Sequence, residues 1–61
     1  MTKLYEDALK LTIDENLRNL TTLLDWASRT SDMAEKIQHV DQAHMLLGEV
    51  VANLRELQQK R

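Results

Sequence analysis

The sequence predicts an all-α fold, specifically an antiparallel helical hairpin, from three observations. The 61 residues include no proline and one glycine, so little interrupts a helix. Two long stretches repeat apolar residues at alternating intervals of three and four, which is the spacing of one helix face. A polar cluster at residues 28–32 separates these stretches, and a short connection between helices favours antiparallel neighbours. We therefore treat residues 1–61 as a single helical-hairpin domain.

The N-terminal segment, about residues 2–11, has an apolar stripe that is out of phase with the stretch after it. Glu6 and Lys10 stand where the following stripe would need apolar residues. Two structures fit: a short separate helix, or one continuous helix that changes face. The sequence from Thr12 to Glu15 has the form of a capping box, so we expect a break or kink at Thr12. The apolar residues of the segment are Leu4, Tyr5, Ala8, Leu9 and Leu11.

The first long helix is expected over about residues 13–29. Asp14 and Glu15 suit the positive end of a helix dipole, and the polar cluster that begins at Ser28 ends the helix. Its predicted seam, which faces the second helix, has intervals of 4, 3, 4 and 3 and consists of Ile13, Leu17, Leu20, Leu24 and Ala27.

The second helix is expected over about residues 32–59, with Asp32 and Glu35 as a cap-like pair at its start. Its predicted seam is Ile37, Val40, His44, Leu47, Val51 and Leu54. A second stripe lies beside it: Val40, Ala43, Leu47, Val50, Leu54 and Leu57. Counting outward from a turn at 29–32 places Leu24 near Ile37 and Leu17 near His44. His44 is therefore expected on the seam and His39 away from it.

Several large apolar residues are left outside this predicted seam, and they predict a protein interface. Each such side chain left in water forgoes roughly 1.5–3 kcal/mol of burial, whereas a core this small supplies only about 3–5 kcal/mol. No cysteine is present to add a disulfide. We therefore expect the hairpin to pack in a bundle or on a helical partner, unless the N-terminal segment folds back over this face. The predicted partner-binding residues are Leu23, Trp26, Leu46, Val50, Leu54 and Leu57.

Gly48 and Trp26 each allow two interpretations. With Ala52, Gly48 forms a small-x-x-x-small pattern that would let another helix approach closely, or it is a tolerated surface glycine. Trp26 is either an interface residue, since tryptophan is enriched at binding hot spots, or a partial cap over the end of the hairpin.

The sequence gives no sign of catalysis, of a cofactor or of a metal site, so we expect a protein that is not an enzyme. His39 and His44 are five residues apart, unlike the i, i+4 pair of a helical zinc site. The net charge is −2, and Lys36 is the only cation between Asp32 and Arg55, so no nucleic acid is expected as a partner. No apolar run approaches the ~20 residues of a membrane span. Acidic residues near the N-terminus argue against a signal peptide, and we expect a cytoplasmic protein.

The chain resembles the YscE-like co-chaperones of the type III secretion needle protein. The resemblance rests on the chain length, on the start MTKLYEDAL, on the polar central turn and on the second helix AEKIQHVDQAHMLLGEVVANL. It implies a helical hairpin that pairs with a larger helical-repeat chaperone in the bacterial cytoplasm. Together the two would keep the needle subunit from polymerising. The turn of this chain contains no glycine and Gly48 has no place in the family pattern, so no residue role is transferred.

A homodimer is the alternative to a larger partner. Two copies of such a hairpin can form a four-helix bundle, as in small inhibitors or in the RNA-binding modulators of plasmid copy number. Lys3, Lys10 and Arg18 lie on one side of the N-terminal half, but Asp14 and Asp25 interrupt them. No aromatic residue lies among these cations to stack on a base. RNA binding is therefore the weaker form of this alternative.

Overall fold

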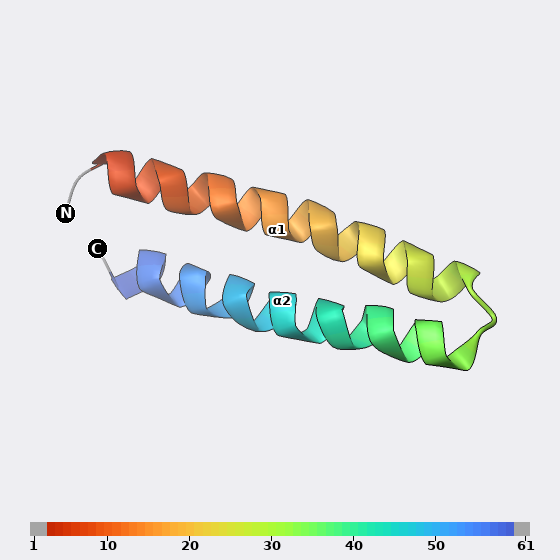
Figure 1. The fold of residues 1–61 in the computed structure, drawn as a ribbon. Coiled ribbons are helices and arrows are strands. Elements are labelled where there is room, and N and C mark those ends of the chain that lie inside the picture. The colour runs from red at the N-terminus through yellow and green to blue at the C-terminus, as the bar shows by residue number, and fades with distance from the viewer. Residues whose placement is uncertain (1–2, 60–61) are drawn as a thin grey trace.

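The computed structural model describes residues 3–59 and shows a helical hairpin, as the sequence predicts. Helix α1 spans Lys3–Arg29 and helix α2 spans Met33–Gln59. The two helices run antiparallel and side by side along their whole length, so both ends of the chain lie at the same end of the molecule (Figure 1). The hairpin measures 46 × 15 × 10 Å. Only one layer of contact, between α1 and α2, is available to form a core.

Helix α1 is continuous, so the break expected at Thr12 is wrong. The Thr12 hydroxyl donates a hydrogen bond to the carbonyl of Ala8 at 3.1 Å, one turn back along the same helix. Thr21 makes the same bond to the carbonyl of Leu17. A threonine inside a helix satisfies its hydroxyl in this way, and the Thr-x-x-Glu pattern at residue 12 therefore occurs without a cap. The N-terminal segment does not fold back over another face.

The turn is held by polar contacts around Thr30. The Thr30 amide donates to the carbonyl of Trp26 at 3.1 Å and closes the end of α1. The Thr30 hydroxyl donates to the Glu35 carboxylate at 3.0 Å and accepts the Asp32 amide at 3.2 Å. The Lys36 amide donates to the carbonyl of Asp32 at 2.9 Å and begins α2. No described residue has a positive φ, which explains why this turn needs no glycine.

Side chains tie the two helix ends together near this turn. The ammonium group of Lys36 donates to the carbonyl of Ala27 at 2.8 Å, across from α2 to the C-terminal end of α1. A cation there also complements the negative end of the helix dipole. On the outside of α1, Arg29 pairs with Asp25 at 2.9 Å, but both side chains are exposed and the pair contributes little to stability.

The helix–helix seam has the heptad spacing of a coiled coil. Its buried and half-buried residues recur along both helices at intervals of three, four or seven. Each helix therefore places a side chain against the other helix once every one or two turns. The buried members are Ile13, Leu20 and Ala27 on α1 and Ala43 and Val50 on α2; Leu9, Leu23, Leu46 and Leu57 are half-buried against them.

The predicted seam is right for part of α1 and wrong for α2. Ile13, Leu20 and Ala27 are buried as expected. Leu17 and Leu24 are exposed, and Leu9 and Leu23 take their place against the core. The observed stripe runs from Leu9 to Ala27 without a change of phase, whereas the predicted one stopped at Ile13. Burying the longer stripe brings a further turn of α1 into contact, and this removes the reason for a break at Thr12.

On α2 the predicted seam residues lie on the outside. Ile37, Val40, Leu47, Val51 and Leu54 are all exposed, and the core is formed instead by Ala43, Val50 and their neighbours. The histidines exchange places for the same reason. His39 is half-buried beside Trp26, with ring centroids 5.6 Å apart, while His44 is exposed.

Candidate protein-binding face

The structure separates the six predicted partner-binding residues into two groups. Leu23, Leu46, Val50 and Leu57 pack at the helix–helix seam, and Val50 is only 2% exposed. The prediction that these four form a free surface is therefore wrong. Leu54 and Trp26 are exposed, at 49% and 52%. Both predicted apolar stripes of α2 are present, but the one in the interior is the stripe with Ala43, Val50 and Leu57 and not the predicted seam.

The large exposed apolar side chains gather on one side of the hairpin. Their positions on α2 repeat at intervals of three and four, so they form a second continuous stripe beside the buried one. We call Ile37, Val40, His44, Leu47, Val51 and Leu54 the outer stripe of α2. With Leu17 and Leu24 of α1, which flank the seam on the same side, these residues form what we call the apolar face.

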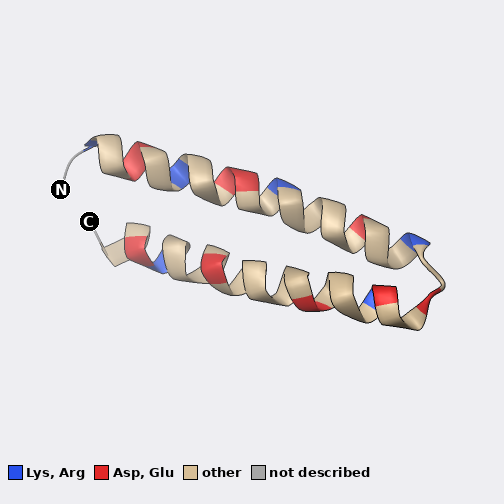
Figure 2. Cartoon of the chain, viewed as in Figure 1, with Lys and Arg blue, Asp and Glu red and all other residues tan. Residues whose placement is uncertain are grey.

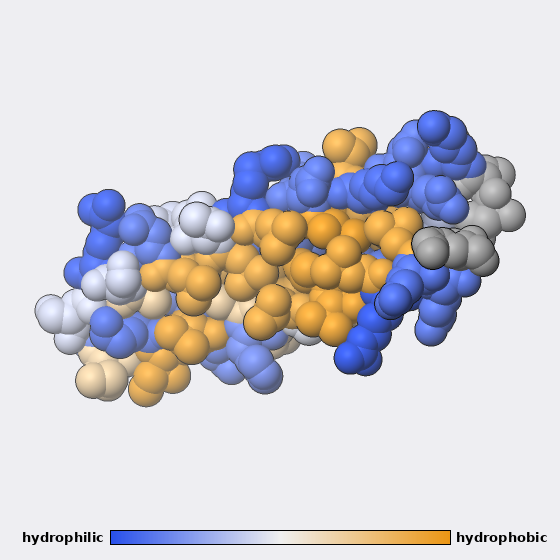
Figure 3. Space-filling view, turned by 180° about the vertical axis from the view of Figure 1, so that it is seen from behind, coloured by the Kyte–Doolittle hydropathy of each residue, from blue (hydrophilic) through white to orange (hydrophobic). Residues whose placement is uncertain are grey.

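This face is broad for a protein of this size. A continuous hydrophobic area crosses both helices, and hydrophilic side chains lie along its edges (Figure 3). Ile37 is 61% exposed and Leu24 is 52% exposed, so each offers more than half of its side chain to a second surface. Contiguous exposed apolar patches on small soluble proteins mark interaction sites more often than chance.

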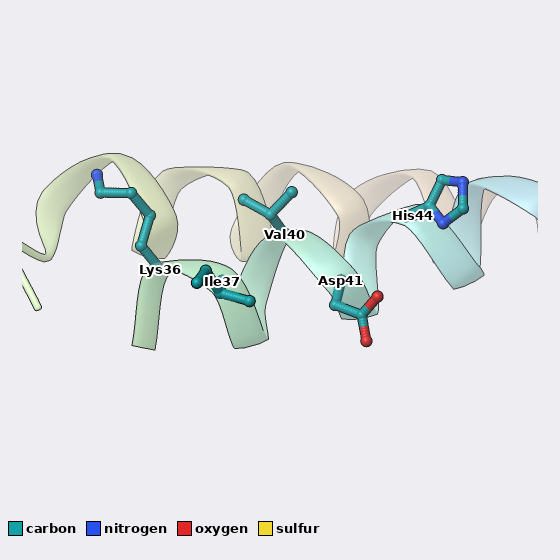
Figure 4. Close-up of a pocket in the computed structure, with 5 residues that line it drawn as sticks. All are labelled: Lys36, Ile37, Val40, Asp41 and His44. Carbon is teal, nitrogen blue, oxygen red and sulfur yellow. The ribbon is translucent and has the colours of Figure 1, made fainter. Parts of the chain in front are cut away.

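Two hollows lie on the apolar face. One, of about 220 Å³, lies between the helices and is lined by Leu20, Leu24, Val40, Ala43, His44 and Leu47. The other, of about 410 Å³, lies along α2, where Val40 and Ile37 stand between Lys36 and His44 (Figure 4). Both are open to solvent. The first is lined mainly by aliphatic side chains, and the second joins Ile37 and Val40 to the polar Lys36, Asp41 and His44. Such hollows suit the protruding side chains of another helix.

The opposite side of the hairpin is polar and carries different contacts. By heptad position it presents Thr12 and Asn19 of α1 and Gln42 and Glu49 of α2. Lysine, arginine, aspartate and glutamate are spread along both helices when the molecule is seen from the side opposite to Figure 3 (Figure 2). The hairpin is thus amphipathic across its thickness as well as along each helix.

Two aromatic residues connect the helices on this polar side. The Tyr5 hydroxyl donates to the Glu56 carboxylate, which raises the pKa of the Tyr5 phenol above its ordinary value of 10.0. Three heptads further along α1, Trp26 tilts against the His39 ring at 56°. The Nδ1 atom of His39 is buried and has no hydrogen-bond partner among the described residues. Trp26 thus covers the turn end of the seam, which corresponds to its interpretation as a cap.

Gly48 has no role in the packing of the hairpin. A β-carbon built on it would meet nothing within 4 Å, so the close approach that its small size permits is not to α1. A glycine inside a helix costs about 1 kcal/mol relative to alanine. Gly48 lies beside Leu47 and Val51 at the edge of the apolar face, on the side of α2 away from α1.

Two further features were sought in the described residues, a metal-binding cluster and a membrane-spanning helix. Among residues 3–59 there is no group of three or more His, Cys, Asp or Glu side chains that could hold a metal ion. No helix within that range is long and apolar enough to cross a membrane.

The fold and the face define the class of protein, a two-helix amphipathic hairpin with one broad apolar side. Comparison with known proteins adds no narrower assignment. The sequence matches no protein-family model, and neither a curated protein nor a solved structure is significantly similar to it.

Proposed function

We propose that this protein is a small protein-binding adaptor that lays its apolar face on the surface of a helical partner. The observation that carries the proposal is the outer stripe of α2, which has the spacing of a helix seam and no counterpart within the hairpin. An amphipathic helix that docks in this way is recognised through apolar anchors at i, i+3/i+4 and i+7. Leu47, Val51 and Leu54 supply that pattern at the centre of the face.

The energetics support an interaction of this kind. Full burial of a large apolar side chain from water is worth roughly 1.5–3 kcal/mol. The large apolar side chains of the face are 39–61% exposed, so each gains part of this, and several together are comparable to the stability expected of a hairpin this small. A partner that covers the face would therefore stabilise the hairpin as well as bind it.

The resemblance to YscE-like co-chaperones supports a narrower form of the proposal. In this form the partner is a larger helical-repeat chaperone, and the pair holds a type III secretion needle subunit in its unpolymerised state in the bacterial cytoplasm. Its support is the chain length, the start MTKLYEDAL, the polar central turn and the pattern of the second helix. In this proposal the anchors are the exposed residues of the outer stripe, since Leu46, Val50 and Leu57 pack at the helix–helix seam.

The test is binding to a purified helical-repeat chaperone of needle subunits, measured by titration calorimetry. We expect Leu47→Asp to weaken binding about a hundredfold, since it places a charge in the centre of the face. Leu11→Asp is the control, because Leu11 is also an exposed leucine, at 66% against 48% for Leu47, but lies on the outside of α1, away from the face. Equal losses in both variants would remove the face from the proposal, and no binding by the wild type would remove this class of partner.

A further inference from the structure

The outer stripe of α2 is a second complete coiled-coil seam. Its intervals are 3, 4, 3, 4 and 3 from Ile37 to Leu54, the same alternation that joins α1 to α2. At 1.5 Å per residue it is about 27 Å long. Within the described hairpin only its edge touches α1, and its members are exposed. The stripe thus has the length and spacing to hold one further helix.

The residues beside this stripe have charges that would complement those of a second copy in an antiparallel pair. Asp41, Gly48 and Arg55 follow Val40, Leu47 and Leu54 directly and are seven residues apart, so they form one ridge. When two copies of a helix pair antiparallel, such a ridge meets itself in the opposite direction. Asp41 then faces Arg55 of the second copy, Arg55 faces Asp41, and Gly48 faces Gly48. Neither Asp41 nor Arg55 has an ion-pair partner within residues 3–59.

A parallel arrangement does not have this complementarity. In a parallel pair the ridge would meet the residues on the other side of the stripe, which are Lys36, Ala43 and Val50. Ala43 and Val50 are buried against α1, and the ammonium of Lys36 is bound to the carbonyl of Ala27. A parallel pair would set Asp41 opposite Lys36 but leave Arg55 opposite Val50, so only the antiparallel arrangement pairs both charges of the ridge.

Gly48 supplies an independent observation in the same place. It stands midway between the two charges, and the space over it is empty. The hairpin gains nothing from the missing side chain, whereas a helix that crosses at this point could come closer than any other residue would allow. The glycine lies where the axis of a two-fold dimer would pass.

We propose that two copies of this chain associate through α2, antiparallel and with two-fold symmetry about Leu47 and Gly48. The second copy covers the outer stripe, and Leu17 and Leu24 extend the buried surface on the side of α1. The inference does not depend on the adaptor function. If the larger helical partner uses the same face, it must displace the second copy.

The charge pairs are tested by reversal, with association measured by sedimentation equilibrium. The wild type is expected to be a reversible dimer. Asp41→Arg and Arg55→Asp should each raise the dimer dissociation constant about tenfold, because each replaces two attractive pairs by two repulsive ones. The double variant Asp41→Arg/Arg55→Asp should return close to the wild-type value. Glu15→Arg is the control for Asp41→Arg, since it makes the same change in net charge on the outer side of α1.

The reversals test association separately from folding, because Asp41 and Arg55 are exposed on the hairpin. Circular dichroism on the same samples should therefore show unchanged helicity. A monomer at every concentration reached would overturn the proposal. A dimer that is insensitive to the reversals, or that the double variant fails to restore, would overturn it as well.

The orientation is tested by single cysteines in this cysteine-free chain. Gly48→Cys should form a disulfide-linked dimer on mild oxidation, because the antiparallel pair brings residue 48 of both copies together. Ala34→Cys lies on the same ridge two heptads away, where the antiparallel pair separates the copies by about 42 Å, and should not cross-link. Cross-linking of both variants would show contacts between copies that the antiparallel pairing does not set and would overturn the proposal, as would failure of Gly48→Cys to cross-link.

Discussion

Helix α2 carries two apolar stripes of similar quality, and the structure buries one and exposes the other. The buried stripe contains Ala43, Leu46, Val50 and Leu57, and the outer stripe contains larger side chains on average. The hydrophobicity of α2 alone therefore does not predict which of its stripes is buried. The seam of α1 runs from Leu9 to Ala27 with Asn16 as its polar member, and the stripe of α2 that is buried is the one that packs against it. The difference teaches that a seam is a property of the pair of helices.

The largest expected effect comes from neighbouring valines on the two stripes. Val50 is 2% exposed and Val51 is 39% exposed. Val50→Asp should unfold the hairpin at 25 °C, because an unpaired buried carboxylate costs about 3 kcal/mol or more, close to the whole stability of such a core. Val51→Asp should retain the helical circular dichroism signal of the wild-type monomer. Equal loss of helicity in both variants would contradict the assignment of the stripes.

A smaller difference is expected between two leucines of α1. Leu20→Ala removes a buried side chain from the seam and should lower the free energy of unfolding by about 2–3 kcal/mol. Leu24→Ala removes an exposed side chain and should cost less than about 1 kcal/mol in the monomer. Urea denaturation at a concentration where the protein is monomeric measures both. The reverse order would place Leu24 on the seam, as the sequence pattern alone suggested.

Much of this fold follows from the sequence, and the error in it has a physical origin. The absence of proline, the polar cluster from Ser28 to Asp32 and the two periodic stretches predict two helices and their turn. The predicted α1 seam contains Leu17 and Leu24 in place of Leu23, and this shift exchanges the buried and exposed stripes predicted for α2. Positions one residue apart on a helix differ by only about 100°, so adjacent stripes that are both apolar cannot be ranked by period. The phase conflict at Lys10 was the available signal, because Leu9 continues the observed seam and Lys10 interrupts the predicted one.

The outer stripe also makes Gly48 a site where stability and association should diverge. Gly48→Ala should raise the free energy of unfolding of the monomer by about 1 kcal/mol, since alanine favours the helix and its β-carbon meets open space. The same substitution should weaken the dimer, because it separates the two backbones at the axis. Thermal unfolding at low concentration and sedimentation at high concentration give the two values. A gain in both would show that the position is an ordinary surface glycine.

The smallest effect is expected on the polar side, at the contact between Tyr5 and Glu56. The hydrogen bond to the carboxylate raises the pKa of the Tyr5 phenol above 10.0 in the hairpin. The folded chain therefore holds this proton more tightly than the unfolded chain, and the stabilisation is complete below about pH 10 and declines as the pH rises through the folded pKa. Tyr5→Phe removes this titration but leaves the lysines and arginines unchanged. The urea midpoint of the wild type should accordingly fall more between about pH 8 and about pH 11 than that of Tyr5→Phe. Parallel pH dependences would mean that the contact does not persist in solution, and the polar side would then contribute no specific tie between the helices at this end.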